Sequence, residues 1–172
     1  NYSSGSFDLN AYGDNFADFI NLLQSERSEL ESYSYLSDLA LLENAISKSH
    51  YAQDSQAFNI NEYHDVLDGN VIFMLRPDVM ILKCDYPVHE LWHMHQTEDD
   101  VASVEKNKES YLIGIYRDQH KVYLCEIDSQ VYQLVNLIKQ GNSLGDIFTL
   151  LNDSSDINAA LEYLIVHDWL RM

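Results

Sequence analysis

Two histidines and a glutamate stand at the spacing that zinc peptidases use. Residues 89–93 read H-E-L-W-H and match the pattern H-E-x-x-H. On a helix, His89 and His93 lie one turn apart on one face, where both could bind a Zn²⁺ ion, and Glu90 could act as the general base. His95 follows two residues later and points to the opposite side. The pattern therefore supplies two of the three protein ligands that a catalytic zinc site needs.

A third ligand would have to come from the acidic segment that follows this helix. The candidates are Glu98, Asp99, Asp100 and Glu109. None of them lies in a second convincing helix, and the helix that carries the pattern is short and begins just after Pro87. We therefore interpret it as a surface or interface helix whose Trp92 packs inward. A zinc metallopeptidase built on His89, Glu90 and His93 is the alternative.

The charge of the chain restricts its partners. The 172 residues contain 28 Asp and Glu against 10 Lys and Arg, which gives a net charge of −18, and 46% of the residues are apolar. Nucleic acids and anionic membrane surfaces both bind clustered Lys and Arg, so we expect no nucleic-acid partner and no membrane partner. Cys84 and Cys125 are far apart and indicate free buried thiols. The sequence shows no signal peptide, and we expect a cytoplasmic protein.

The first part of the chain, residues 1–70, reads as two helices. Apolar residues with helical spacing mark one helix over residues 11–24 and a second over residues 33–51. These stripes consist of Phe16, Phe19, Ile20 and Leu23, and of Tyr35, Leu39, Leu42 and Ile46. Two helices with one stripe each can cover one another and little else. We therefore expect this part to contact a further partner surface.

From residue 71 the periodicity changes to that of strands. The runs 71–75 and 79–82 are rich in β-forming residues and are separated by Arg76-Pro77-Asp78, which favours a turn. A short helix is expected over residues 88–96, and the polar stretch 96–110 reads as a loop. Residues 71–100 are thus predicted to connect two parts of the protein.

The last part, residues 101–172, reads as a hairpin followed by three helices. Strands are expected over 111–117 and 121–127. Asp128 can cap a helix that ends at Gly141, Ser143 and Asp146 resemble a capping box, and a third helix follows Ser154 or Ser155. Residues 169–172 return as a last strand. The sequence predicts an α+β fold with a helical N-terminal part and a C-terminal winged-helix-like domain that has a small antiparallel sheet.

The charge of the third helix bears on what such a domain can bind. Helices that read DNA carry Arg, Lys, Asn or Gln on their outer face. Residues 154–168 contain Asp156, Glu162 and Asp168 but no Lys or Arg. The function of a winged-helix transcription regulator is therefore only a weaker alternative for this chain. The 12 tyrosines of the chain favour a protein–protein interface instead.

Several ordered segments together resemble one bacterial protein family long labelled DNA-binding. Residues 35–43 resemble its segment YLxDLAxLE, and residues 12–19 read Y-G-x-x-F-A-x-F, as in the same family. Three further segments fit: R-P at 76–77, Y-P-V-x-x-L-W at 86–92 and G-x-S-L at 141–144. The resemblance extends from about Tyr12 to Leu170.

Proteins of this family, the MbnC-like and HvfC-like proteins, are partner subunits of multinuclear non-haem iron oxidases that modify ribosomally made peptides. The resemblance implies that the iron belongs to a TIM-barrel oxidase, and that this chain has no catalytic residue, metal ligand or cofactor of its own. The partner subunit helps to hold the complex and the leader of the precursor peptide. In the methanobactin pathway, precursor cysteines become oxazolone and thioamide groups that bind copper. The short N-terminal part favours the MbnC-like branch or a truncated chain.

We expect the hairpin to offer a strand edge to the leader peptide. The expected peptide-binding residues are Tyr111, Ile113, Ile115, Tyr116 and Tyr123. Three residues of the family pattern near the short helix are expected at the oxidase interface. These are Tyr86, Pro87 and Trp92. His89 and His93 fall on unspecified positions of that pattern. An acidic surface would suit a leader rich in Lys and Arg.

Overall fold

The computed structural model describes residues 13, 15–59, 69–97, 109–151 and 155–172. The helices are α2 (Phe16–Glu26), the 3₁₀ helix η1 (Ser28–Tyr33), α3 (Leu36–Tyr51), α4 (Val88–Thr97), α5 (Ser129–Lys139), α6 (Leu144–Leu150) and α7 (Ser155–Val166). The strands are β1 (Met74–Leu75), β2 (Met80–Cys84), β3 (Tyr111–Asp118), β4 (Lys121–Glu126) and β5 (Leu170–Arg171). The α+β class predicted from the sequence is confirmed.

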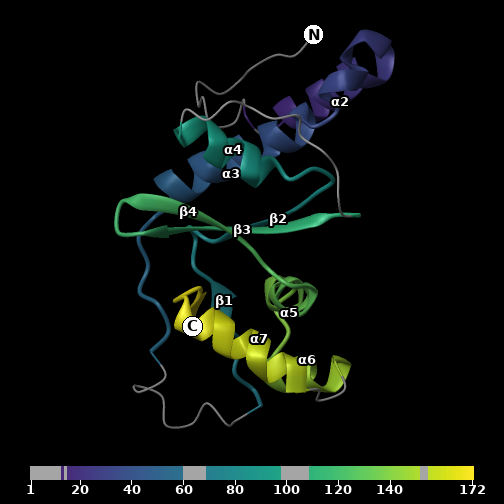
Figure 1. The fold of residues 1–172 in the computed structure, drawn as a ribbon. Coiled ribbons are helices and arrows are strands. Elements are labelled where there is room, and N and C mark those ends of the chain that lie inside the picture. The colour runs from purple at the N-terminus through teal and green to yellow at the C-terminus, as the bar shows by residue number, and fades with distance from the viewer. Residues whose placement is uncertain (1–12, 14, 60–68, 98–108, 152–154) are drawn as a thin grey trace, which may run out of the picture.

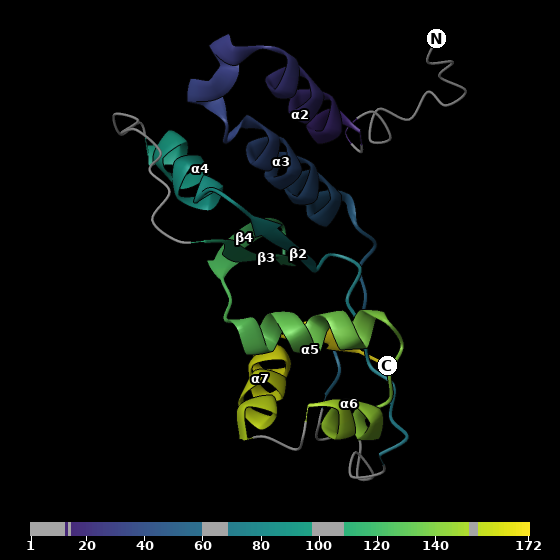
Figure 2. The same ribbon diagram turned by 90° about the vertical axis from the view of Figure 1, so that its right-hand side faces the viewer.

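A small antiparallel sheet of order β2-β3-β4 separates two groups of helices. Helices α2, α3 and α4 lie on one side of it, and α5, α6 and α7 lie on the other (Figures 1 and 2). The second group includes the short antiparallel ladder of β1 and β5. These three helices and β5 belong to the predicted C-terminal domain, whereas β1 comes from the predicted connecting segment 71–100.

The central strand β3 divides the core into two. Side chains of a strand alternate between its faces, and Ile113 and Ile115 are buried with Leu42 of α3 and Val88 of α4. On the opposite face, Leu112 and Tyr116 pack against the core of α5 and α7. Each face of the sheet is therefore covered by its own group of helices.

Local sequence signals mark the ends of the C-terminal helices as expected. The Asp128 carboxylate accepts a hydrogen bond of 2.7 Å from the backbone N–H of Val131 and caps α5. Gly141 follows α5 with φ 78°, a left-handed conformation that suits glycine. Ser143 and Asp146 form the predicted capping box at the start of α6. These three short-range predictions are confirmed.

The two strand runs on either side of the Arg76-Pro77-Asp78 turn separate into different sheets. β1 pairs with β5, whereas β2 pairs with β3. β2 lies in the predicted connecting segment and β3 in the predicted C-terminal domain, so one sheet contains residues from both. The predicted boundary at residue 100 lies outside the described residues. Within the described ranges, the helices are too short or too polar to cross a membrane.

Candidate functional site

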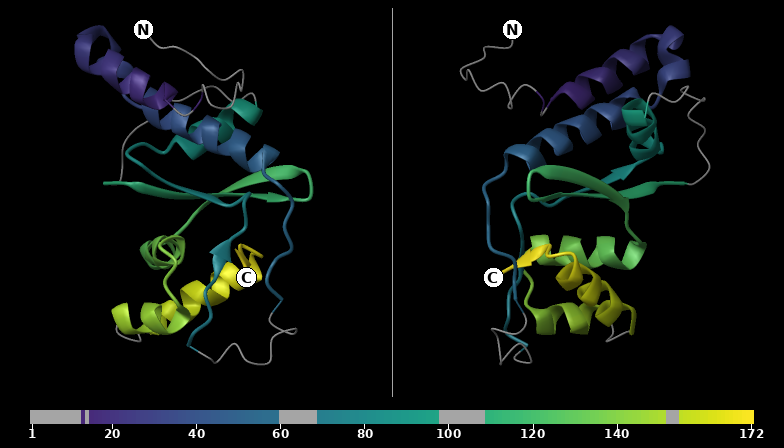
Figure 3. Two further views of the ribbon diagram at one scale, coloured as in Figure 1. Left: turned by 180° about the vertical axis from the view of Figure 1, so that it is seen from behind. Right: turned by 60° about the vertical axis from the view of Figure 1, so that its left-hand side comes forward.

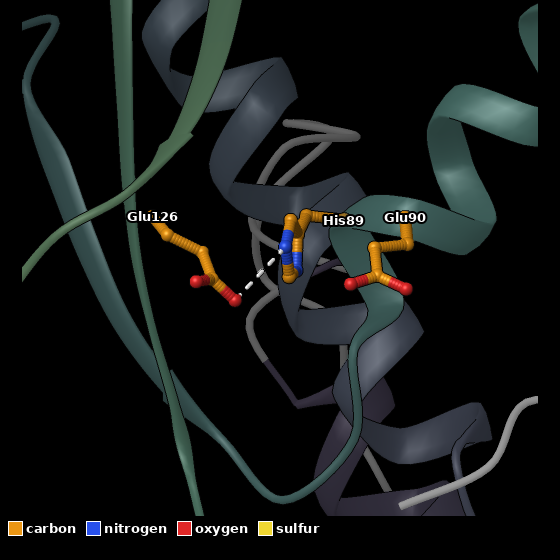
Figure 4. A group of neighbouring side chains, drawn as sticks. All are labelled: His89, Glu90 and Glu126. Carbon is orange, nitrogen blue, oxygen red and sulfur yellow. Dashed lines mark ion pairs between the residues drawn. The ribbon is translucent and has the colours of Figure 1, made fainter. Parts of the chain in front are cut away.

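The H-E-x-x-H segment lies in α4, where this helix meets the end of β4. The imidazole of His89 is 9% exposed, and its Nε2 lies 3.4 Å from Oε1 of Glu126 (Figure 4). Glu90 follows His89 on the helix, and Figure 4 shows the His89 ring between the two carboxylates. One possible ligand atom from each of the three residues lies within 4.8 Å of the others. Two exposed carboxylates and one buried imidazole thus meet at the surface of the molecule.

This geometry differs from that of a zinc peptidase. His93 is exposed, its ring contacts the Trp92 ring, and among the described residues it does not join the group of possible ligands. Glu126 takes the third position that the sequence assigned to the acidic segment. Of the residues named there, Glu98, Asp99 and Asp100 lie outside the described residues, and Glu109 is not part of the group.

The sequence did not identify Glu126 as a possible metal ligand, although it did predict the hairpin that positions this residue. Glu126 is the last residue but one of the predicted hairpin, and in the antiparallel register it lies opposite Ile113. Its side chain therefore shares a sheet face with Ile113. The sequence does not show that α4 covers this face. The packing of α4 on the sheet is what brings His89 close to Glu126.

Three of the predicted peptide-binding residues are buried. Tyr111, Ile113 and Ile115 lie in the middle strand of the sheet, and all three side chains face α3 and α4 in the core. A peptide at the surface cannot contact them in this fold. The prediction is corrected at these positions because β3 has a strand on both sides and a helix layer over the face that they occupy.

The other two predicted peptide-binding residues lie on the opposite face of the hairpin. Tyr123 of β4 is exposed, and its ring stacks on that of Tyr116, with the centroids 5.6 Å apart. The Tyr116 ring in turn packs against the buried Trp169 ring, with the centroids 5.6 Å apart. Tyr163 and His167 of the α7 region complete this aromatic group, which sequence reasoning did not anticipate.

Strand β4 is an edge of the sheet within the part of the chain that the structure describes. The backbone N–H of Ile127 donates to the carbonyl of Leu112 at 2.9 Å. Hydrogen bonds alternate in direction along an antiparallel pair, so the N–H groups of Val122 and Leu124 point away from β3. The edge can therefore accept a further strand.

The residues predicted at the oxidase interface have structural roles at the start of α4. Pro87 is buried, and Tyr86 and Trp92 are half-buried against the core between the sheet and α3. The Asp38 carboxylate accepts hydrogen bonds from the backbone N–H groups of Asp85 and Tyr86, at 2.7 and 2.9 Å. Contact with a partner at these three positions stays a prediction.

Helix α2 leaves a row of large apolar side chains exposed. Phe16, Phe19 and Leu22 are 50%, 52% and 56% exposed, and we call these three residues the α2 stripe. Their spacing of three places them along one face of the helix. The sequence predicted Phe16 and Phe19 to lie on a covered face, which is wrong within the described residues, where α2 packs on α3 and η1 and both rings are half exposed. Figures 2 and 3 show α2 beyond α3, at the end of the molecule far from the sheet.

Both cysteines are free. Burial raises the pKa of the Cys84 thiol to about 12, and the nearby carboxylates of Asp38 and Asp85 add to this effect. Burial also raises the pKa of Cys125, which is half-buried with its Sγ 3.6 Å from the Tyr163 hydroxyl oxygen. A raised pKa keeps a thiol protonated and unreactive at neutral pH.

In comparisons with known proteins, no family model matches this chain, and no curated protein matches it.

Proposed function

We propose that this chain is the non-catalytic partner subunit of a multinuclear non-haem iron oxidase that modifies a ribosomally made precursor peptide. The α2 stripe is the observation that carries the proposal. Apolar side chains that gather on one exposed helix face are typical of a surface that another protein covers. The ordered segments that resemble MbnC-like proteins indicate which partner this is.

The charges around the α2 stripe indicate the chemistry of the partner surface. Asp18, Glu26 and Glu29 of α2 and η1 are exposed near the stripe. Interfaces combine an apolar centre with a polar rim, and opposite charges on the two rims speed association. We therefore expect the oxidase surface to carry apolar side chains surrounded by Lys and Arg.

The leader of the precursor peptide is assigned to the outer edge of β4. A peptide that adds a strand there gains main-chain hydrogen bonds from Val122 and Leu124, and its side chains can contact Tyr123 on one face. The net charge of −18 favours a leader containing Lys and Arg. The expected product is a methanobactin-type copper chelator, made in the cytoplasm by oxidation of precursor cysteines.

Two observations favour this proposal over a zinc peptidase and over a winged-helix transcription regulator. A zinc peptidase needs His93 beside His89, and among the described residues His93 is exposed and outside the group of possible ligands. A winged-helix regulator needs a basic recognition helix, and Asp156 and Glu162 are exposed on α7. These carboxylates would repel phosphate.

Replacing Phe19 with serine is expected to weaken the complex with the oxidase about 10- to 100-fold, because a buried Phe side chain contributes about 1.5–3 kcal/mol. The measurement is co-purification of the tagged chain with a co-expressed oxidase subunit of this class, followed by titration of the two purified subunits. Phe19 is half exposed in the chain alone, so its loss should leave the thermal unfolding midpoint nearly unchanged.

Leu150→Ser is the matched control for this experiment. Leu150 is also a large exposed apolar residue, but it lies on α6 at the opposite end of the molecule (Figure 2). We expect it to bind the oxidase like the natural chain. The proposal fails if the natural chain does not co-purify with the oxidase and the oxidase processes its peptide equally well without it.

Replacing Val122 with proline should weaken leader binding at least 10-fold, because proline removes an N–H that points to the outer edge of β4. The measurement is fluorescence anisotropy of a labelled precursor leader. Val122→Thr is the control, since it keeps the N–H and the β-branched shape of the side chain. Equal losses in both variants would contradict binding at this edge.

A further inference from the structure

The cluster of His89, Glu90 and Glu126 brings three metal-ligating side chains together from two separate elements. His89 and Glu90 belong to the first turn of α4, and Glu126 is the last residue of β4. We propose that these three side chains bind one divalent transition-metal ion of the zinc class. This site is independent of the oxidase proposed above, whose iron would be held by the other subunit.

The donor atoms determine which ions fit. One imidazole nitrogen and two carboxylate oxygens suit Zn²⁺, Mn²⁺, Fe²⁺ or Co²⁺, whereas Mg²⁺ and Ca²⁺ prefer oxygen donors alone. Three protein ligands would leave at least one coordination position for water. Soft ions such as Cu⁺ are disfavoured because Cys84 is buried and its thiol is held protonated by a pKa of about 12.

The positions of the three ligands require only small movements of exposed side chains. Around a tetrahedral ion with bonds of about 2.0–2.1 Å, ligand atoms lie about 3.3 Å apart. The His89 Nε2 and Glu126 Oε1 atoms are already 3.4 Å apart, and the whole group lies within 4.8 Å. Glu90 and Glu126 are exposed and can change rotamer, whereas His89 is fixed by its burial beside Tyr111.

The charge of the cluster favours a cation. Glu90 lies in the first turn of α4, where a carboxylate also stabilises the helix dipole. Stabilisation of the helix dipole accounts for a carboxylate at Glu90. It does not account for Glu126, because Glu126 lies on a strand. With His89 neutral, the cluster carries two negative charges, and a divalent ion would balance both of them. An ion here would also tie α4 to β4 and so stabilise the folded protein.

The test uses the full chain, first stripped of metal by a chelator. Calorimetric titration with Zn²⁺ should give one site per chain with a dissociation constant in the micromolar range or tighter, and Co²⁺ should give visible absorption bands of a low-coordinate ion. Zn²⁺ should also raise the thermal unfolding midpoint. Glu126→Gln should weaken Zn²⁺ binding at least 10-fold and remove most of the shift.

Two control variants separate this site from adventitious binding to an acidic surface. Glu162→Gln and His120→Gln remove an exposed carboxylate and an exposed imidazole elsewhere, and both should bind Zn²⁺ like the natural chain. The proposal is overturned if Zn²⁺ binds only in the millimolar range, or if Glu126→Gln binds it as tightly as the natural chain. Because no oxidase is present in this titration, neither result alters the co-purification test.

Discussion

Replacing Asp78 with alanine is expected to lower the free energy of unfolding by about 3–5 kcal/mol, because the change breaks a buried ion pair and leaves its partner without a counter-charge. The Asp78 side chain is 1% exposed and accepts hydrogen bonds of 3.0 and 2.7 Å from Nε and Nη2 of Arg76. It also accepts one of 3.0 Å from the backbone N–H of Arg117. Urea unfolding of the purified chain measures the loss.

The large effect follows from the place of Asp78 in the fold. The turn that contains it separates β1 from β2, and Arg76 also donates a hydrogen bond of 2.8 Å to the carbonyl of Arg117 on β3. This one carboxylate therefore fixes the junction of the two sheets. Asp118→Ala on the exposed hairpin turn is the control and should change stability by less than about 0.5 kcal/mol. A similar small change for Asp78→Ala would contradict this account.

The same residue predicts a dependence of stability on pH. Burial raises the pKa of Asp78, but the hydrogen bonds from Arg76 and Arg117 and the charge of Arg76 lower it more, so the folded-state pKa lies below the ordinary value. Its contribution to stability is therefore fully present above the unfolded-state pKa of about 3.9 and is lost as the pH falls through the folded-state pKa. The stability difference between the natural chain and Asp78→Asn should shrink below about pH 4.

Residues that act on their neighbours in the chain were predictable from the sequence. Asp128, Gly141 and Ser143 end or begin helices through contacts within a few residues, and such contacts are encoded in local spacing. The turn at Arg76-Pro77-Asp78 was predicted on the same grounds. Its role in fixing two sheets was not, because it depends on Arg117, which lies 39 residues beyond Asp78.

The candidate site was predictable only in part, for the same reason. The spacing of His89 and His93 is visible in the sequence, and a shared metal site on one helix was the alternative to a surface or interface helix. The structure instead buries His89 against the sheet and leaves His93 exposed, so the neighbour of His89 is Glu126 from a strand. Likewise, periodicity identified the apolar residues of α2, but it could not show that Phe16 and Phe19 have no element of the described chain covering them.

Replacing Gly114 with alanine is expected to destabilise the chain by about 1–3 kcal/mol or more through overpacking. A Cβ atom at this position would lie 2.3 Å from Cη2 of Trp169 and 3.2 Å from Sγ of Cys125. Trp169 is fully buried and packs against the rings of Tyr116 and Tyr163, so it cannot move aside without disturbing both. The measurement is again the urea midpoint.

A double-mutant cycle with Trp169→Phe tests whether Trp169 is the cause. Phenylalanine lacks the distal ring atoms that the new Cβ would meet, so Gly114→Ala should cost at least about 1 kcal/mol less in the Trp169→Phe chain than in the natural one. Equal costs in the two chains would show that the strain arises elsewhere. A measured coupling would establish that β3 lacks a side chain at position 114 because the C-terminal tryptophan occupies that space, which fixes how closely α7 and β5 approach the sheet.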